Sequence, residues 1–172
     1  HMNQPTAALF GLAIDNQAPY RVYAAQNDNT HISIPSRTRS GQITWDDNEP
    51  FQGGEGGQTA VKPDGSVIYA ADRAGIDRID RRTGQSVNIS VWPEDEFTSP
   101  LKDVKYRFYY TLPVLLSVHD PNVLYTAAQR VFRSVTEGNS WDAISGDLTR
   151  HDPKTLGHSG GPITGDMNGP EV

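Results

Sequence analysis

The stretch Val67-Ile68-Tyr69-Ala70-Ala71 is an apolar run of five residues, and Ile76-Asp77-Arg78-Ile79 follows it after four residues. A short apolar run that is rich in β-branched and aromatic residues and bounded by turn residues is typical of a buried β-strand. The second run ends at Asp80-Arg81-Arg82-Thr83-Gly84-Gln85, in which Gly84 can take the positive φ that a tight hairpin requires. These residues therefore predict consecutive antiparallel strands.

Runs of the same kind fill the rest of the chain, whereas windows with apolar residues at i, i+3, i+4 and i+7 are almost missing. The further predicted strands are residues 8–14, 21–25, 31–34, 42–45, 59–61, 87–92, 114–118, 123–127, 131–134 and 141–144. Many short strands with almost no room for a helix between them predict an all-β protein.

The strands also repeat as a group. Three of them contain a Tyr-x-Ala sequence, and its tyrosines, Tyr23, Tyr69 and Tyr125, are 46 and 56 residues apart. Four-stranded propeller blades repeat every ~40–50 residues. We therefore predict a partial β-propeller of about three four-stranded blades, and the alternative is a β-sandwich with accidental spacing.

The repeat sets the predicted boundaries of the chain. The blades are expected at about residues 7–50, 51–92 and 111–150 of a single domain over residues 3–150, with an insertion at 93–110 that is rich in charged and aromatic residues. His1-Met2 is interpreted as a cloning remnant, and residues 151–172 as a Gly/Pro-rich tail. Residues 3–6 show no signal-peptide features, which predicts a cytoplasmic protein as encoded, or an extracytoplasmic one if the chain has been trimmed.

Composition excludes several classes of function. The chain has 172 residues, 15 Lys+Arg against 21 Asp+Glu, and a formal net charge of −6, so we expect no nucleic-acid and no membrane partner. Cysteine is absent, which excludes disulfides and a cysteine nucleophile. The apolar runs, among them Val114-Leu115-Leu116, are all far too short to span a bilayer.

One segment carries a resemblance to a known family. Residues 131–141, Val-Phe-Arg-Ser-Val-Thr-Glu-Gly-Asn-Ser-Trp, resemble the BNR or Asp-box repeat, Ser-x-Asp-x-Gly-x-x-Trp, except that Thr136 replaces the aspartate. The wider chain resembles the bacterial "glycosyl hydrolase, BNR repeat" proteins and, more distantly, sortilin (VPS10)-type propellers. The segments that carry this wider resemblance are residues 20–29, 53–57, 82–95, 105–108, 119–125, 147–150 and 160–164.

This resemblance implies a hydrolase, and the alternative is a non-catalytic module that binds a carbohydrate or a protein partner. Those relatives are much longer and usually form full propellers, whereas this chain has about three blades. A row of three blades exposes two end faces that a complete ring would cover. We therefore expect a homo-oligomer that stacks these open blade faces, and the alternative is a half-ring with polar outer blades.

Three carboxylates, Asp28, Glu55 and Asp72, follow equivalent predicted strands, so they are expected to converge on one face as the catalytic residues. Paired carboxylates suit glycoside hydrolysis, and metal-assisted attack of water suits a small ester or lactone. The oxygens of Asp28, Asn29 and Glu55 are candidate ligands for Ca²⁺. The alternative is that these side chains serve turns and caps.

The predicted substrate-binding residues complete the candidate site. They are Gln26, Tyr106, Arg107 and His119. Aromatic faces such as that of Tyr106 stack on sugars, and Arg107 suits a substrate carboxylate. The alternatives are packing of Tyr106 between blades, an ion pair between blades for Arg107 and a structural turn for His119.

Overall fold

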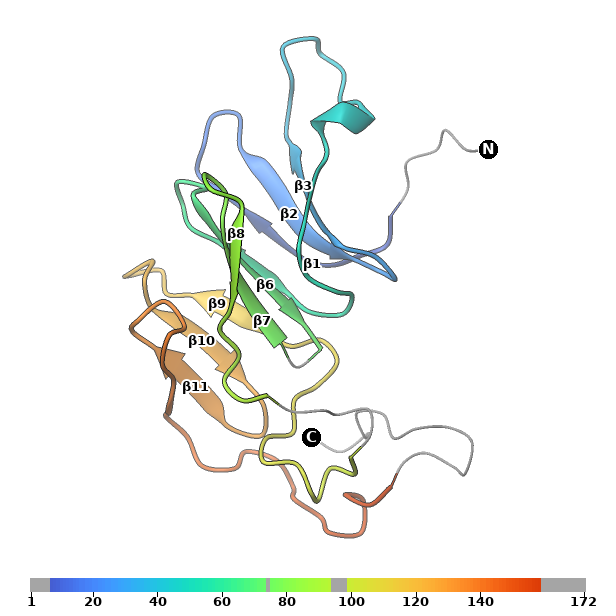
Figure 1. The fold of residues 1–172 in the computed structure, drawn as a ribbon, viewed down its shortest axis with the longest axis vertical. Coiled ribbons are helices and arrows are strands. Elements are labelled where there is room, and N and C mark those ends of the chain that lie inside the picture. The colour runs from blue at the N-terminus through green and yellow to red at the C-terminus, as the bar shows by residue number, and fades with distance from the viewer. Residues whose placement is uncertain (1–6, 74, 94–98, 159–172) are drawn as a thin grey trace.

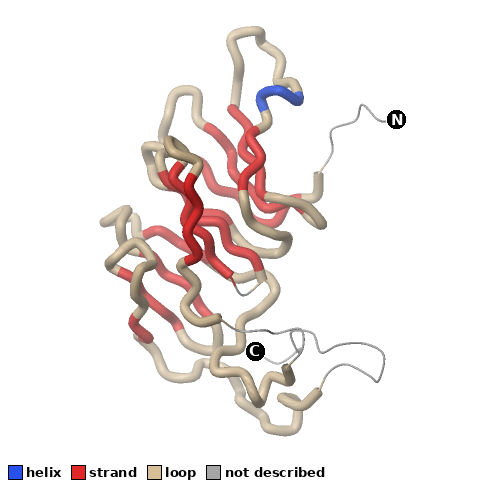
Figure 2. Tube along the Cα trace, viewed as in Figure 1, coloured by secondary structure: helices blue, strands red, loops and turns tan. Residues whose placement is uncertain are grey.

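The computed structural model describes residues 7–73, 75–93 and 99–158, and the predicted cloning remnant and most of the predicted tail lie outside these residues. The all-β prediction is confirmed: the described residues form three four-stranded antiparallel sheets and one short 3₁₀ helix. Figure 1 shows the sheets following one another along the long axis of the molecule, and Figure 2 shows how much of the chain is loop. None of the described segments forms a helix long and apolar enough to cross a membrane.

Each sheet contains four strands that are consecutive in the sequence, in spatial order. The first sheet consists of β1 (Leu9–Ile14), β2 (Arg21–Gln26), β3 (His31–Pro35) and β4 (Glu49–Phe51). The central sheet consists of β5 (Thr59–Val61), β6 (Val67–Asp72), β7 (Gly75–Asp80) and β8 (Gln85–Asn88). The third sheet consists of β9 (Val114–Leu116), β10 (Leu124–Ala127), β11 (Val131–Ser134) and β12 (Asp142–Ala143).

The predicted strand at residues 42–45 is wrong. These residues lie between β3 and β4 and lead into the 3₁₀ helix η1 (Trp45–Asp47). Thr44 causes this conformation, because its backbone N–H and its hydroxyl both donate to Asp47 Oδ2, at 2.8 and 3.0 Å. Local side-chain bonds of this kind offer the backbone an alternative to a strand.

Two apolar clusters hold the three sheets together. Tyr23 of the first sheet packs with Ile68 and Ile79 of the central sheet. Tyr69 of the central sheet packs with Leu124 of the third sheet. Both faces of the central sheet are thus buried, which explains the unbroken apolar run of β6.

The Asp-box-like turn between β11 and β12 is closed by hydroxyl groups. The Ser134 hydroxyl oxygen accepts from the backbone N–H of Gly138 at 2.8 Å, and the Thr136 hydroxyl oxygen accepts from that of Ser140 at 3.0 Å. Threonine therefore bonds the turn from the position at which the BNR repeat has aspartate.

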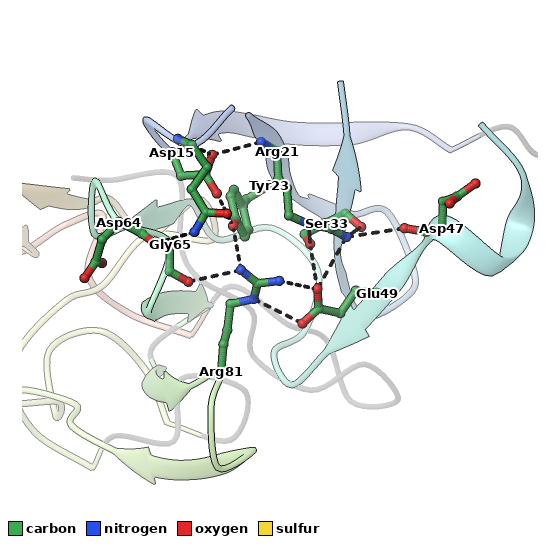
Figure 3. Close-up of polar contacts among 10 residues, drawn as sticks. Asp15, Arg21, Tyr23, Ser33, Asp47, Glu49, Asp64, Gly65 and Arg81 are labelled. Carbon is green, nitrogen blue, oxygen red and sulfur yellow. Dashed lines mark hydrogen bonds and ion pairs between the residues drawn. The ribbon is translucent and has the colours of Figure 1, made fainter. Parts of the chain in front are cut away.

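The connections between strands lie at two opposite ends of the sheets. Because neighbouring strands are antiparallel, the β2–β3, β6–β7 and β10–β11 turns lie at the same end as the connections from one sheet to the next. We call this the crossover end and the other one the hairpin end. The hairpin end carries a polar network between the first and central sheets, in which the buried Asp15 carboxylate accepts from the Tyr23 hydroxyl at 2.7 Å (Figure 3).

Candidate functional site

The three predicted catalytic carboxylates lie at the crossover end. Asp28 is in the β2–β3 turn, Glu55 is in the β4–β5 connection, and Asp72 is the last residue of β6. β2 and β6, the second strands of the first and central sheets, bring Asp28 and Asp72 to this end. Glu55 reaches the same end from the connection that follows β4, the fourth strand of the first sheet, so the three carboxylates meet although their strands are not equivalent.

Asp28 and Glu55 are in direct contact. The Asp28 backbone N–H donates to Glu55 Oε2 at 2.8 Å, so the two carboxyl groups are close neighbours. Asp28 has a φ of 55°, a left-handed conformation that aspartate tolerates in a turn. The hydrogen bond to Glu55 and the negative charge of Glu55 raise the pKa of Asp28 above its usual range.

Glu55 is held by donors from three further segments. The Tyr110 hydroxyl, the Asp28 backbone and side chain and the Arg73 guanidinium bond to its carboxylate and lower the pKa of Glu55 to about 2. Arg73 Nη2 lies 3.1 Å from Glu55 Oε1. The guanidinium of Arg73 also lies 5.9 Å from the centre of the Tyr110 ring. Two adjacent carboxyl groups thus have pKa values shifted in opposite directions.

Asp72 supports the same loop from the central sheet. A Cβ atom placed on Gly54 would lie 2.5 Å from Asp72 Oδ2, so the carboxylate packs directly against that glycine. Burial raises the pKa of Asp72, and the nearby Glu55 charge acts in the same direction. Gly57 is equally constrained, because its Cβ would lie 1.9 Å from the Ala71 carbonyl oxygen. The glycine pairs around Glu55 therefore allow its loop to lie against the end of β6.

Asp28, Glu55 and Arg73 border a shallow pocket of about 430 Å³, which we call the carboxylate pocket, whereas Asp72 does not line it. It is lined by Asp28, Asn29, Thr30, Gly53, Gly54, Glu55 and Arg73. The pocket contains two carboxyl groups and a guanidinium, so it can exchange protons with a ligand and stabilise a negative charge on one.

The predicted metal ligands Asp28, Asn29 and Glu55 all line this pocket. In residues 7–73, 75–93 and 99–158, no group of three or more His, Cys, Asp or Glu side chains is arranged to hold a metal ion. The Asn29 side-chain oxygen accepts from the Thr30 backbone N–H at 2.9 Å. Both Glu55 oxygens already accept hydrogen bonds, from Arg73 and from Asp28.

Two predicted substrate-binding residues lie outside the carboxylate pocket. Gln26, at the end of β2, donates to the Thr30 carbonyl oxygen at 3.0 Å and lines a separate apolar hollow on the first sheet. His119 is exposed in the β9–β10 turn at the hairpin end, where its backbone N–H donates to the Ser117 hydroxyl at 3.2 Å. The topology thus separates His119 from the carboxylate pocket.

Tyr106 and Arg107 are engaged with the third sheet. The Tyr106 ring lies 4.8 Å from that of Phe132, edge to face. Arg107 is 4% exposed, and its Nη2 bonds to Asp147 Oδ2 at 2.9 Å and to the Thr149 hydroxyl at 2.6 Å. Burial alone would raise the pKa of Asp147, but hydrogen bonds from Thr149 and Arg107 hold it well below its usual range. Both residues therefore anchor the insertion and the segment after β12 onto the sheet.

Sequence reasoning missed Arg73 and Tyr110. Arg73 directly follows Asp72, so its place at the same turn was a usable signal. Tyr110 is the last residue of the predicted insertion, and nothing in its sequence context indicates that it reaches Glu55.

Comparison with known proteins does not assign the chain to a family. A scan against protein-family models finds none that matches the chain, and a search of the curated proteins finds no significant match.

Proposed function

We propose that the chain is a hydrolase of small esters or lactones, built on a partial β-propeller related to the BNR-type glycosyl hydrolases. One observation carries the activity: Asp28 and Glu55 are neighbouring carboxyl groups in an accessible pocket, joined by the bond from the Asp28 backbone N–H to Glu55, and their pKa values are shifted apart. Paired titratable groups whose environments separate their pKa values are typical of acid–base catalysis.

The contact between the two carboxyl groups favours acyl chemistry over glycoside hydrolysis. The two carboxyl groups of a glycosidase are about 5–9.5 Å apart, so that a sugar carbon or a water molecule fits between them. Glu55 Oε2 lies 2.8 Å from the Asp28 backbone nitrogen, which places the two carboxyl groups side by side rather than on opposite sides of a bound sugar. A carboxyl pair in contact suits attack of water on a carbonyl carbon.

In the proposed reaction Asp28 is the catalytic residue and Glu55 its positioning residue. The Asp28 carboxylate, made more basic by Glu55, takes a proton from water as the water oxygen bonds to the carbonyl carbon. Arg73 stabilises the negative charge that develops on the carbonyl oxygen. The bond to the leaving oxygen then breaks, and Asp28 returns its proton to that oxygen, giving an acid and an alcohol.

The propeller part of the proposal is supported by the arrangement of the sheets. The first strands of successive sheets are neighbours, because β5 contacts both β1 and β9. A radial arrangement of four-stranded sheets brings their first strands together in this way.

In this proposal, Ca²⁺ is a cation that Asp28, Asn29 and Glu55 would bind. The fit is incomplete, because the described residues hold no group of three suitable His, Cys, Asp or Glu side chains. We therefore derive no step of the reaction through this ion.

The test is hydrolysis of acyl-homoserine lactones, aryl esters and aryl glycosides, each with and without chelator and added Ca²⁺. We expect turnover of lactone or ester, and Asp28→Asn should lower kcat by roughly 100-fold or more. Asp46→Asn, an exposed carboxylate at the hairpin end, is the matched control and should leave the rate unchanged. Turnover of glycosides alone would contradict the proposed hydrolysis of esters or lactones. Loss of all turnover on addition of chelator would show that the reaction requires a bound cation.

A binding module is the second candidate function, and one observation favours it. Glu55 accepts from donors on three sides, so its carboxylate is fixed in place rather than free to react. A pocket of this kind presents Arg73 and fixed carboxylates to the hydroxyl groups of a carbohydrate or to a protein partner. Absence of turnover, together with carbohydrate binding that Asp28→Asn abolishes, would establish this alternative.

A further inference from the structure

The first and third sheets each have one face that points away from the central sheet. These two faces correspond to the two kinds of face that pack against each other inside the chain. We propose that a second copy of this chain packs head to tail on them, so that the third sheet of one copy covers the first sheet of the next. This inference is independent of the proposed hydrolysis, because it involves the faces of the end sheets and not the carboxylate pocket.

The internal contacts follow one rule. Tyr23 lies beside Ala13 on the face of the first sheet that is packed against the central sheet. Tyr69 lies beside Ala60 on the face of the central sheet that is packed against the third sheet. We call the face that carries this tyrosine the forward face of a sheet and the opposite one its backward face. Each forward face is therefore buried by the backward face of the next sheet.

The third sheet has the same forward face, but no described residues bring a sheet against it. Tyr125 occupies the position of Tyr23 and Tyr69 in the Tyr-x-Ala repeat, and it lies beside Leu115. Tyr23 and Tyr69 are fully buried, whereas Tyr125 is partly exposed and Leu115 is 57% exposed. Tyr125 and Leu115 therefore expose apolar surface at the position that the first and central sheets bury.

The first sheet has the matching backward face. On the central sheet, the paired residues Ile68 and Ile79 form the backward face that buries Tyr23. Their counterparts by register on the first sheet are Val22 and Ile34. Ile34 lines an apolar hollow of about 360 Å³ on that sheet, together with Leu9, Ile32, Ile43 and Trp45. Trp45 is 73% exposed, so this face offers aromatic as well as aliphatic contact area.

These two exposed sheet faces indicate a second copy of the same chain as the binding partner. A forward face at one end and a backward face at the other repeat the two contacts already formed inside the chain. Contacts of this type are heterologous, and they generate closed rings where the rotation closes. The smallest closed assembly has two copies and six sheets, within the roughly four to eight blades that propellers contain.

Analytical ultracentrifugation of the full chain over a range of concentrations tests the proposal, with 18.9 kDa as the mass of one copy. We expect the native chain to associate, and Leu115→Glu and Ile34→Glu each to raise the dissociation midpoint by roughly 100-fold, because a carboxylate in an apolar contact has no partner. Trp45→Glu replaces Ile34→Glu if that variant fails to fold. Val87→Glu, at an exposed position in β8, is the matched control and should associate normally.

Mixing the two variants distinguishes head-to-tail packing from other modes. Leu115→Glu keeps the backward face of the first sheet intact, and Ile34→Glu keeps the forward face of the third sheet intact. An equimolar mixture of the two variants can therefore form one native contact and should give 1:1 pairs. A native chain that stays at the mass of one copy would overturn the proposal. So would loss of association in only one of the two variants, because a symmetric contact between identical faces behaves in that way.

Discussion

Arg81 and Glu49 join the first and central sheets through two hydrogen bonds, from Nε to Oε1 at 3.1 Å and from Nη2 to Oε2 at 2.5 Å (Figure 3). Arg81 Nη1 also donates to the Tyr23 hydroxyl, which in turn donates to the buried Asp15. A guanidinium and a carboxylate in this paired geometry form a strong and directional contact. The network therefore fixes how the two sheets meet at the end opposite the carboxylate pocket.

Glu49→Gln should lower the free energy of unfolding by about 1–2 kcal/mol at pH 7, because it removes the charge that faces the half-buried Arg81. Arg81 lowers the pKa of Glu49, so this contribution is present above the pKa of the unfolded chain and is lost as the pH falls through the folded pKa. Urea denaturation at pH 7 and pH 3 measures both effects. Arg82→Ala, which breaks a fully exposed pair with Asp80, is the control and should change stability by less than about 0.5 kcal/mol.

His31 should make the protein sensitive to mild acid. Its ring is fully buried, with Nδ1 at 2.7 Å from the Thr59 hydroxyl and Nε2 at 3.0 Å from the Ala71 carbonyl oxygen. Burial lowers the pKa of His31 to about 4. Between pH 6.5 and 4 the unfolded chain binds a proton that the folded chain does not, so stability falls as the pH falls, by up to about 3 kcal/mol.

The measurement is chemical denaturation of the native chain and of His31→Gln at pH 7 and pH 4.5. The variant lacks the titrating ring, so its loss of stability between the two pH values should be smaller than that of the native chain. Equal losses in both proteins would show that other groups cause the acid sensitivity.

Gly57→Ala should destabilise the fold by about 2–5 kcal/mol, because the new Cβ would lie 1.9 Å from the Ala71 carbonyl oxygen and would push the Glu55 loop off β6. Gly146→Ala is the matched control, since a Cβ there meets nothing within 4 Å. Thermal melts of the two variants provide the comparison. Similar melting temperatures would mean that the Glu55 loop is not packed against the end of β6.

The pattern of apolar residues predicted most of the fold, because β5 and β6 of the central sheet bury residues on both faces and therefore read as short apolar runs. The same pattern was misleading at Ile43 and Trp45, which are apolar but exposed. Periodicity detects apolar residues, not the Thr44 and Asp47 bonds that turn this segment into a 3₁₀ helix.

The sequence could predict the site residues whose positions depend on the order of the strands. Asp28 follows β2 and Asp72 ends β6, the second strands of their sheets, so counting strands groups these two residues. Glu55 follows β4, a fourth strand that the sequence pattern did not predict, so strand counting does not account for its place beside Asp28. Tyr110 lies near Glu55 although it belongs to the connection before β9, and no periodic pattern in the sequence encodes the conformation of such a connection.

The pKa values of the carboxyl pair provide a test that does not depend on activity. In an NMR titration, Glu55 should titrate near its pKa of about 2 and Asp28 above its usual range. Glu55→Gln removes the neighbouring negative charge, so the pKa of Asp28 should fall toward its ordinary value. Tyr110→Phe should raise the pKa of Glu55, because the hydroxyl donates to the charged form. An Asp28 pKa unchanged by Glu55→Gln would mean that the two carboxyl groups are not paired.

Arg107 and Asp147 should be coupled in a double-mutant cycle, although Arg107 was a candidate for binding a substrate carboxylate. Asp147→Asn leaves the buried guanidinium with a neutral partner, and weakening a bond to a charged group of this kind costs about 1–3 kcal/mol. Arg107→Met removes the buried charge and leaves Asp147, which is 29% exposed, to solvent. The double variant should therefore be more stable than the sum of the two single effects predicts, by about 1–3 kcal/mol. Additive effects would leave the Arg107 charge without a structural role and would return it to the list of ligand-binding candidates.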